Sequence, residues 1–499
     1  MNSASTFARF LVRYSSALLL SATALGLAIV AISCGGSSSP LMSNAMGTVN
    51  VSISDPPSCM APTGAFTHVF VTVRSVQAHT SSSADDSTPG WQELAPQLAS
   101  APMQVDLFAP SQTNCILAQL GSAELPAGNY QQIRLLLVSN SPAGSDAVPS
   151  TNACAGHGFN CVVLKDGSVH QLDLSSQANT GLKIPPGQVL GGPISVQAGQ
   201  SVDLNVDFNA CASIVPEGNG QYRLKPALTA SQVSTNNSGI SGQIVDSATK
   251  AAIKGNVFVA VEQADSTGTD RIVMETTADA NGNFRFCPLP TGPFDVVAVA
   301  VGPANLPYNA TTVMNVPNGT SLGAIPLVAE TGATAPATLQ GFVTATNAGA
   351  AAQIDVSLAA LQTVTVSGAN RAITIPLQTI AATATTPEVD STSPISVTAA
   401  TSCPSGSPAN TNCAEYTLVV PASNPNVGVF AAGAVTYTAP AAGDVLFTVD
   451  AIAAKPMSGG TPSCSPAEMT TSKDANAQPL KATAATTTDV ARIDFSGCS

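Results

Sequence analysis

The chain has 499 residues, of which 44% are hydrophobic, 4% aromatic and 9% charged, and its formal net charge is −13 at pH 7. This length allows about three domains of roughly 150 residues each, with ample apolar material for their cores. The scarcity of Lys and Arg excludes nucleic acid as a partner, because phosphate recognition depends on basic side chains, and it also excludes a polybasic membrane contact.

An uncharged stretch near the N-terminus, Leu18–Cys34, follows two arginines and ends in small residues. This order predicts a signal peptide over residues 1–33. The sequence Ala31-Ile32-Ser33-Cys34 resembles the lipobox of bacterial lipoproteins, which implies cleavage before Cys34 and a lipid on its thiol. Gly35 after the cysteine resembles the outer-membrane class, which implies a lipid-anchored protein of the cell envelope. An uncleaved membrane anchor and ordinary secretion remain as alternatives.

Residues 34–46 lack periodicity and predict a flexible, lipidated tether. Alternation of apolar and polar residues begins at residue 47, and no long 3.6-residue period follows. Residues 47–236 are therefore predicted to form an all-β domain. Its strands are expected at 49–55, 68–78, 103–108, 131–138, 168–174, 194–197, 202–208 and 222–228.

The same region carries a series of short motifs. In order, these are SISDPP, HVFVTV, WQEL, VDLF, LPAGNYQQIRLLL, TGLKI, VDFNACASI and YRLKPAL. Over residues 47–230 the series resembles the bacterial family called domain of unknown function 4382. That resemblance implies export and a domain boundary near residue 230. Because the family has no established activity, it implies no catalytic residue.

A second sandwich is expected at residues 237–329. Gly242, the Asp246–Gly255 connection, the Asn281-Gly282 turn and the LPTG sequence at 289–292 resemble the carboxypeptidase regulatory-like domain, which is transthyretin-like. Asn-Gly suits the positive φ angles of a type I′ hairpin. The resemblance implies a structural or spacer role, since this module is non-catalytic in its family.

The last region, residues 336–499, is rich in Thr, Ala and Val and alternates in several places. The sequence YTAP at 437–440, followed by an alternating strand, resembles bacterial immunoglobulin-like domains. The chain as a whole is therefore predicted to be all-β, with tandem β-sandwich domains behind a lipoprotein signal peptide.

The chain has 11 cysteines, and setting aside Cys34 for lipid leaves an even number. In an exported chain this number indicates disulfides. Short loops of turn residues predict local bridges Cys154–Cys161 and Cys403–Cys413, while a Cys464–Cys498 bridge could pin the C-terminus. Three pairings remain open for the other four, which are Cys59, Cys115, Cys211 and Cys287.

Few residues suggest a metal site. Asp203 and Asp207 share one face of the strand VDLNVDFN, and their oxygens lie on a face that could help to hold Ca²⁺. The alternative is the solvated face of an amphipathic strand. His68 and His79, with Asp55 and Asp207, could serve a metal-dependent hydrolase, but residues eleven apart on a regular strand point to opposite faces. No catalytic residue, metal or cofactor is predicted.

The favoured function is a lipid-anchored cell-envelope surface protein with a non-catalytic binding or scaffolding role. Its partners are the membrane, through the N-terminal lipid, and an extracellular polymer or envelope protein. Recognition is expected on the long turn-rich loops, since loops carry variable polar groups on a rigid support. These loops are Thr80–Gly90, Ser139–Asn160 and Thr401–Cys413. The alternatives are the metal-dependent envelope hydrolase and a carbohydrate-binding adhesin, which the scarcity of aromatic residues disfavours.

Overall fold

The computed structural model describes most of the chain from residue 45 onward. The described ranges are 45–55, 66–84, 87–109, 118–174, 181–184, 188–190, 192–217, 220–225, 227–233, 239–265, 267–290, 292–330, 332–380, 389–400, 403–454 and 464–498. The predicted signal peptide, Cys34, Cys59 and Cys115 lie outside these ranges. We describe the chain as an N-terminal domain, residues 45–233, and a C-terminal body, residues 239–498.

Strands account for nearly all regular structure in the N-terminal domain, which confirms the all-β prediction. Its elements are β1 (Met46–Ser54), β2 (Phe66–His79), β3 (Gln92–Glu93), β4 (Met103–Asp106), β5 (Ala118–Pro126), β6 (Gly128–Tyr130), β7 (Gln132–Leu137), β8 (Cys161–Leu164), β9 (Val169–Asp173), β10 (Leu182–Ile184), β11 (Val189–Leu190), β12 (Ile194–Val196), β13 (Ser201–Phe208), β14 (Ile214–Glu217), β15 (Gln221–Leu224) and β16 (Leu228–Val233), with the short helices η1 (Pro96–Ala99) and α2 (Ala210–Ser213).

These strands form two main sheets around one core. One sheet has the order β11-β16-β13-β1-β5, and the other has the order β10-β7-β2-β8-β9-β15-β14, with β3 and β4 paired to β2. Alternate residues of β1, namely Val49, Val51 and Ile53, are buried in this core, as period-two burial requires. Its neighbour β13 runs parallel to it in the middle of the first sheet.

The C-terminal body contains the remaining strands. They are β17 (Ile240–Asp246), β18 (Asn256–Ala264), β19 (Thr269–Thr277), β20 (Asn283–Phe286), β21 (Phe294–Val301), β22 (Thr311–Val316), β23 (Ser321–Leu327), β24 (Ala337–Asn347), β25 (Ala350–Ala351), β26 (Ile354–Val366), β27 (Ala369–Ile375), β28 (Thr379–Ile380), β29 (Val389–Asp390), β30 (Ile395–Val397), β31 (Asn412–Val420), β32 (Asn426–Ala431), β33 (Ala434–Thr438), β34 (Thr448–Ala454), β35 (Glu468–Thr471), β36 (Thr487–Asp489) and β37 (Ile493–Phe495), with η5 (Pro303–Asn305).

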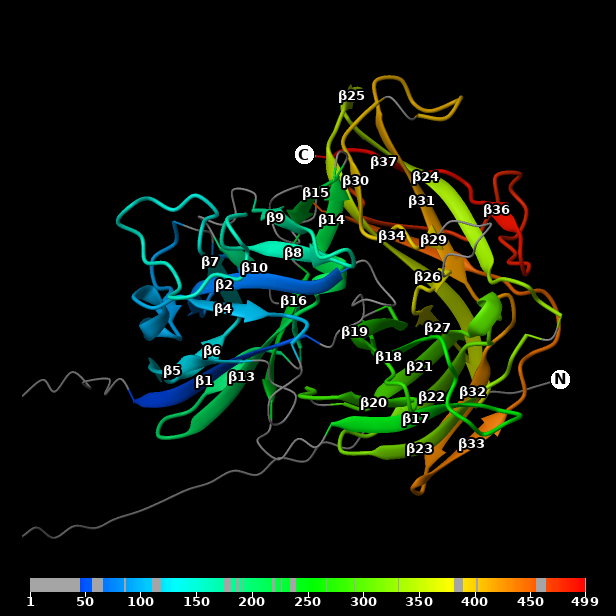
Figure 1. Cartoon of the computed structure of the whole chain (residues 1–499), viewed down its shortest axis with the longest axis horizontal. Coiled ribbons are helices and arrows are strands. Elements are labelled where there is room, and N and C mark those ends of the chain that lie inside the picture. The colour runs from blue at the N-terminus through cyan, green and yellow to red at the C-terminus, as the bar shows by residue number, and fades with distance from the viewer. Residues whose placement is uncertain are drawn as a thin grey trace, which may run out of the picture. The chain divides into compact units, whose positions relative to one another are not determined.

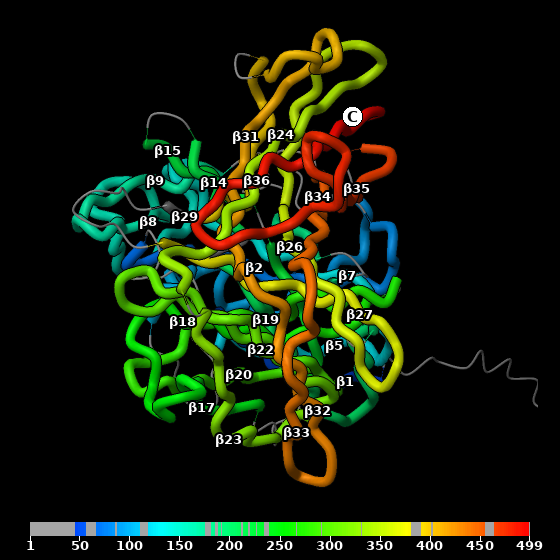
Figure 2. Tube along the Cα trace, turned by 90° about the vertical axis from the view of Figure 1, so that its right-hand side faces the viewer, coloured from blue at the N-terminus to red at the C-terminus, as the bar shows by residue number. Residues whose placement is uncertain are grey.

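One long sheet joins the two regions of the C-terminal body. Its order is β33-β32-β22-β21-β18-β19-β27-β26-β34-β35, with β30 paired to β26. The middle strands come from the segment before residue 330, and both flanks come from the segment after it. The junctions are the parallel pairs β22–β32 and β19–β27. The segments before and after residue 330, which the sequence suggested as separate domains, therefore contribute strands to the same sheet (Figure 2).

Smaller sheets cover both faces of this long sheet. Figure 1 shows β17, β20 and β23 as a layer beside β18, β21 and β22. Every residue of β21 is buried: Val296 and Ala298 face the core shared with that layer, whereas Val297 and Val299 face a core built with β24 and β31. A strand covered on both faces is expected to be mostly hydrophobic, and in FDVVAVAV every residue except Asp295 is apolar.

The turn at Asn281-Gly282 differs from the predicted hairpin. It connects β19 to β20, but β20 pairs with β17, so the turn carries the chain from one sheet to another. Gly282 alone has positive φ there, at +80°. A Cβ atom at this position would lie 2.3 Å from the Ile244 carbonyl oxygen, which explains the glycine.

Three disulfides are present among the described residues, and they are pairs that the sequence suggested: Cys154–Cys161, Cys403–Cys413 and Cys464–Cys498. Cys287 is also disulfide-bonded. The first bridge closes the C-terminal end of the predicted recognition loop Ser139–Asn160, and the second closes the loop that ends at Cys413.

Candidate functional site

The loop from Ser139 to Asn160 is held at its base by two asparagines. The fully buried Asn160 accepts a bond from the Thr72 amide through Oδ1, at 2.8 Å, and donates through Nδ2 to the Val138 carbonyl, also at 2.8 Å. Asn140 Oδ1 accepts from the amides of Phe159 and Asn160, each at 2.9 Å. Both ends of the loop are thereby tied to the second sheet.

A glutamine of β4 secures the inner side of this loop. Gln104 accepts from the Ala153 amide at 2.7 Å and donates to the Phe159 carbonyl at 3.0 Å. The Cys154–Cys161 bridge closes the same end. The tip remains in solvent, where Val148 is 43% exposed. The result is an exposed tip on a rigid base, which suits recognition with little loss of entropy on binding.

His79 holds the beginning of the loop Thr80–Gly90. Its Nδ1 accepts from the Ser81 amide at 2.9 Å and its Nε2 donates to the Pro89 carbonyl at 3.1 Å, so both ring nitrogens are occupied. The ring also lies 5.1 Å from that of Trp91, whose other neighbour is the Arg134 guanidinium, 4.2 Å from the ring centroid. Trp91 is half-buried, and its ring is tilted by 56° to that of His79.

The histidines do not converge on a metal site. The exposed His68 contacts Asp106 through Nδ1, at 2.7 Å, whereas His79 is buried. Among the described residues, no group of three His, Cys, Asp or Glu side chains could hold a metal ion. The described residues therefore do not form the metal centre that the hydrolase alternative requires.

The loop Thr401–Cys413 is described from residue 403. The Cys403–Cys413 bridge closes it, and Asn410 donates to the Gly349 carbonyl at 3.2 Å. Gly349 lies in the exposed turn between β24 and β25, so the two turns lie side by side at one end of the body.

The candidate calcium ligands Asp203 and Asp207 instead belong to a ladder of polar side chains between β1 and β13. In the parallel register Asn50 lies opposite Asp203 and Ser54 lies opposite Asp207. Asn50 Nδ2 donates to Asp203 at 2.8 Å, and Ser54 Oγ donates to Asp207 at 2.8 Å. Asp203 is half-buried and Asp207 is only 7% exposed, so the face is not the solvated one that the sequence allowed.

Two buried carboxyl groups meet at the end of this ladder. Burial, and then the charge of Asp207, raise the pKa of Asp55 well above its usual range. Burial raises the pKa of Asp207 to about 7, although the Ser54 hydroxyl opposes that shift. Alternation alone could not reveal this pair, because a strand pattern gives the face of a residue but not what covers that face.

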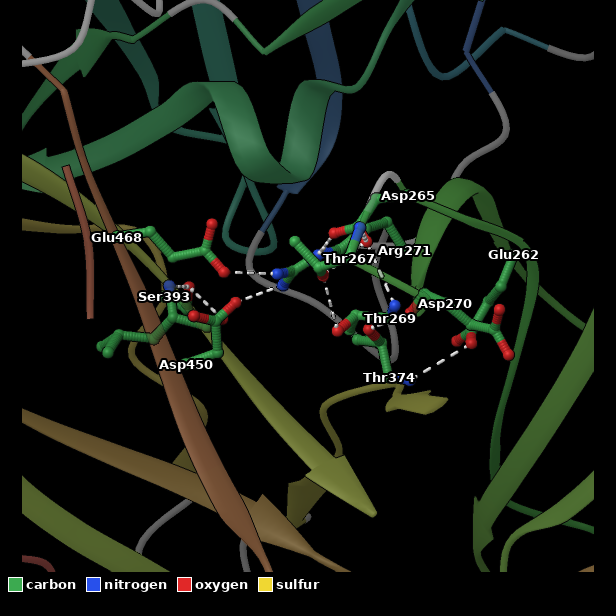
Figure 3. A network of polar contacts seen from close by, with 11 residues as sticks. Glu262, Asp265, Thr267, Thr269, Asp270, Arg271, Thr374, Ser393, Asp450 and Glu468 are labelled. Atoms are coloured by element: carbon green, nitrogen blue, oxygen red, sulfur yellow. Dashed lines mark hydrogen bonds and ion pairs between the residues drawn. The ribbon is translucent and has the colours of Figure 1, made fainter. Parts of the chain in front are cut away.

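An arginine network in the C-terminal body was not expected from the sequence. Arg271 of β19 contacts Asp265 at 3.0 Å, Glu468 of β35 at 2.7 Å, and Asp450 of β34 (Figure 3). Arg371 of β27 contacts both Asp270, at 2.5 Å, and Asp295, at 2.7 Å. These ion pairs connect strands from the two sides of residue 330. A single arginine within a strand sequence does not indicate which acidic residue it will contact, so the sequence could not predict these ion pairs.

A Gly-x-Ser-x-Gly pattern occurs at residues 319–323 but is not a nucleophile elbow. An elbow needs a sharp turn between a strand and a helix. Ser321 instead begins β23 and pairs with Ser241 of β17. The pattern therefore supplies no catalytic serine.

Residues 46–226 match the family model described as "Domain of unknown function (DUF4382)". The N-terminal domain thus carries a DUF4382 match. Comparison with curated proteins finds no match. The DUF4382 description assigns no activity to this domain.

Solved structures similar to the chain include pilins. The shaft pilin SpaA from Lactobacillus rhamnosus GG is 10% identical, with a TM-score of 0.16, over 57% of this chain and 98% of the pilin. A streptococcal ancillary pilin is 11% identical, with a TM-score of 0.17, over 80% of this chain and 96% of the pilin. TM-scores this low carry no argument about function. In the described residues no helix is long and apolar enough to cross a bilayer.

Proposed function

We propose that this protein is a lipid-anchored surface protein of the bacterial cell envelope that binds a polymer or another envelope protein through its N-terminal domain. The observation that carries the proposal is the exposed loop Ser139–Asn160 on its base of buried amides and a disulfide. Disulfides persist in oxidising compartments, which supports export. The lipobox-like sequence ending at Cys34 supports the lipid anchor.

The binding surface is tested by photo-crosslinking in intact cells. A photoreactive amino acid replaces Val148 at the loop tip, and a matched control replaces Leu446, which is 47% exposed in the C-terminal body. We expect adducts of higher mass at position 148 and few at position 446. Equal labelling at both positions, or none at 148, contradicts a role for this loop.

The anchor is tested by a Cys34→Ala substitution. We expect the substituted protein to retain its leader or to leave the membrane fraction, and mass spectrometry of the wild-type N-terminus to show acyl chains on the cysteine. Normal membrane retention with a processed leader contradicts lipidation at this residue.

A further inference from the structure

A cavity of about 850 Å³ lies between the N-terminal domain and the C-terminal body. Its apolar lining comes from both: Phe66 and Leu228 from the domain, and Phe258 and Ile375 from the body. A cavity of this size fits a small organic molecule, and such sites combine apolar walls with a few polar groups.

Three acidic residues line the cavity. One of them, Glu415 of β31, is exposed and accepts a bond from Gln340. The other two come from opposite parts of the chain. Asp207 comes from β13 and Glu275 from β19. Burial raises the pKa of each to about 7. The described lining residues include no Lys, Arg or His. Among the described residues, therefore, no cation of the cavity lining offsets the loss of water at either carboxylate.

Two buried basic side chains of the N-terminal domain, Arg223 and Lys225, are already engaged. Arg223 donates two bonds to Asp355, at 2.8 and 2.6 Å, and a third to Glu217. Lys225 donates to the hydroxyl of Ser357, a residue that lines the cavity. Among the described residues that line the cavity, none supplies a positive charge for Asp207 and Glu275, so a ligand could supply it.

A glutamine supplies an independent indication of a ligand. Gln378 lines the cavity and is fully buried, yet both its side-chain oxygen and its side-chain nitrogen lack a hydrogen-bond partner. Its backbone is bonded, since its amide donates to the Val419 carbonyl and its carbonyl accepts from Ser391. Leaving a buried amide side chain unpaired is costly, so such a group calls for a partner.

We propose that this cavity binds a small organic cation, an amine with an apolar body. The ammonium group lies between the carboxylates of Asp207 and Glu275, Gln378 hydrogen-bonds to its polar end, and the apolar walls cover its hydrocarbon. A metal ion fits less well, because the described residues provide no group of three metal-binding side chains.

The proposal is tested by isothermal titration calorimetry on the full-length protein in detergent, with benzylamine as the probe and benzyl alcohol as its neutral counterpart. We expect benzylamine to bind and benzyl alcohol to bind at least about tenfold more weakly, since charge-assisted bonds are the stronger ones. Equal affinity for the two probes, or no binding of benzylamine, overturns the proposal.

Substitutions then locate the site. Asp207→Asn and Glu275→Gln should each weaken benzylamine binding about tenfold or more. Gln378→Leu should weaken it by a factor of about 3 to 10. The control Glu124→Gln, at an exposed position of β5, should leave it unchanged. Equal affinity for benzylamine in all four variants overturns the assignment. A second contrary outcome is that the wild-type protein binds Ca²⁺ but not benzylamine and that Asp207→Asn abolishes the Ca²⁺ binding.

Discussion

The N-terminal domain and the C-terminal body bury their strands in different ways. The core of the N-terminal domain draws only on residues 49–230, so that domain closes around its own sheets. In the body, one core combines Phe258 and Val297 from before residue 330 with Leu339 and Leu418 from after it. Two segments that look like successive modules in the sequence thus share one sheet and one core, whereas the hydrophobic core of the region before them draws on that region alone.

The largest expected effect concerns which parts of the chain fold when they are produced as separate fragments. A fragment of residues 45–233 should fold alone, and so should one of residues 239–498. A fragment of residues 239–330 should not, because it exposes the outer face of β21 and the edges of β19 and β22. Circular dichroism and size-exclusion chromatography measure the outcome. A monomeric 239–330 fragment with a cooperative melting transition contradicts the shared fold.

The ion pair between the N-terminal domain and the C-terminal body should have the next largest effect on the free energy of unfolding. Arg223 and Asp355 are both buried. Asp355→Asn therefore removes the bidentate carboxylate partner of a buried guanidinium and leaves it, among the described residues, only the carboxylate of Glu217, which is 32% exposed. We expect the free energy of unfolding to fall by about 3–5 kcal/mol. The control is Asp444→Asn, which removes an exposed ion pair with Lys481 and should change stability by less than about 1 kcal/mol. Similar losses in urea denaturation for both variants would contradict the burial argument.

Asp207 tests the opposite case, a buried carboxyl that forms no ion pair with a described residue. Its folded pKa of about 7 lies above the ordinary value of 3.8, so the folded state keeps a proton that the unfolded state loses. Stability should therefore fall as pH rises from about 4 to about 7. Asp207→Asn should remove this contribution and stabilise the protein at pH 8, by up to about 4 kcal/mol.

Denaturation curves at pH 5 and pH 8 measure this slope for the full-length protein. Asp55 lies beside Asp207, and its pKa is raised too, so part of the pH dependence should remain in the variant. Glu124→Gln serves as the exposed control and should keep the wild-type slope. An unchanged slope in Asp207→Asn would show that this group does not retain its proton.

The smallest expected effect on stability compares one loop of the N-terminal domain with one loop of the C-terminal body. Asn160→Ala in the N-terminal domain leaves the buried Thr72 amide without its acceptor and should cost about 1–3 kcal/mol. Asn410→Ala in the C-terminal body removes a bond from an exposed side chain and should change stability by less than about 0.5 kcal/mol. Thermal unfolding of both variants measures the difference. Equal effects would contradict the buried clamp.

Much of the strand content was predictable from the sequence. The strands expected at 49–55, 68–78 and 202–208 correspond to β1, β2 and β13. By contrast, β5 was missed, because its sequence AQLGSAELP contains Gly, Ser and Pro and few β-branched residues. The candidate site was less predictable: Asp207 was singled out for calcium, but its buried neighbours and the unpaired Gln378 were not foreseen.

The sequence by itself determined that this chain is built of strands, and the local Cys spacing indicated the bridges Cys154–Cys161 and Cys403–Cys413, because alternation and short loops are local properties. Only the tertiary structure decided which strand edges meet. The pairs β19–β27 and β22–β32 join residues far apart in the chain, and no local pattern specifies a distant partner. The same holds for charge: whether a carboxyl such as Asp207 is solvated or buried depends on the elements that fold over it.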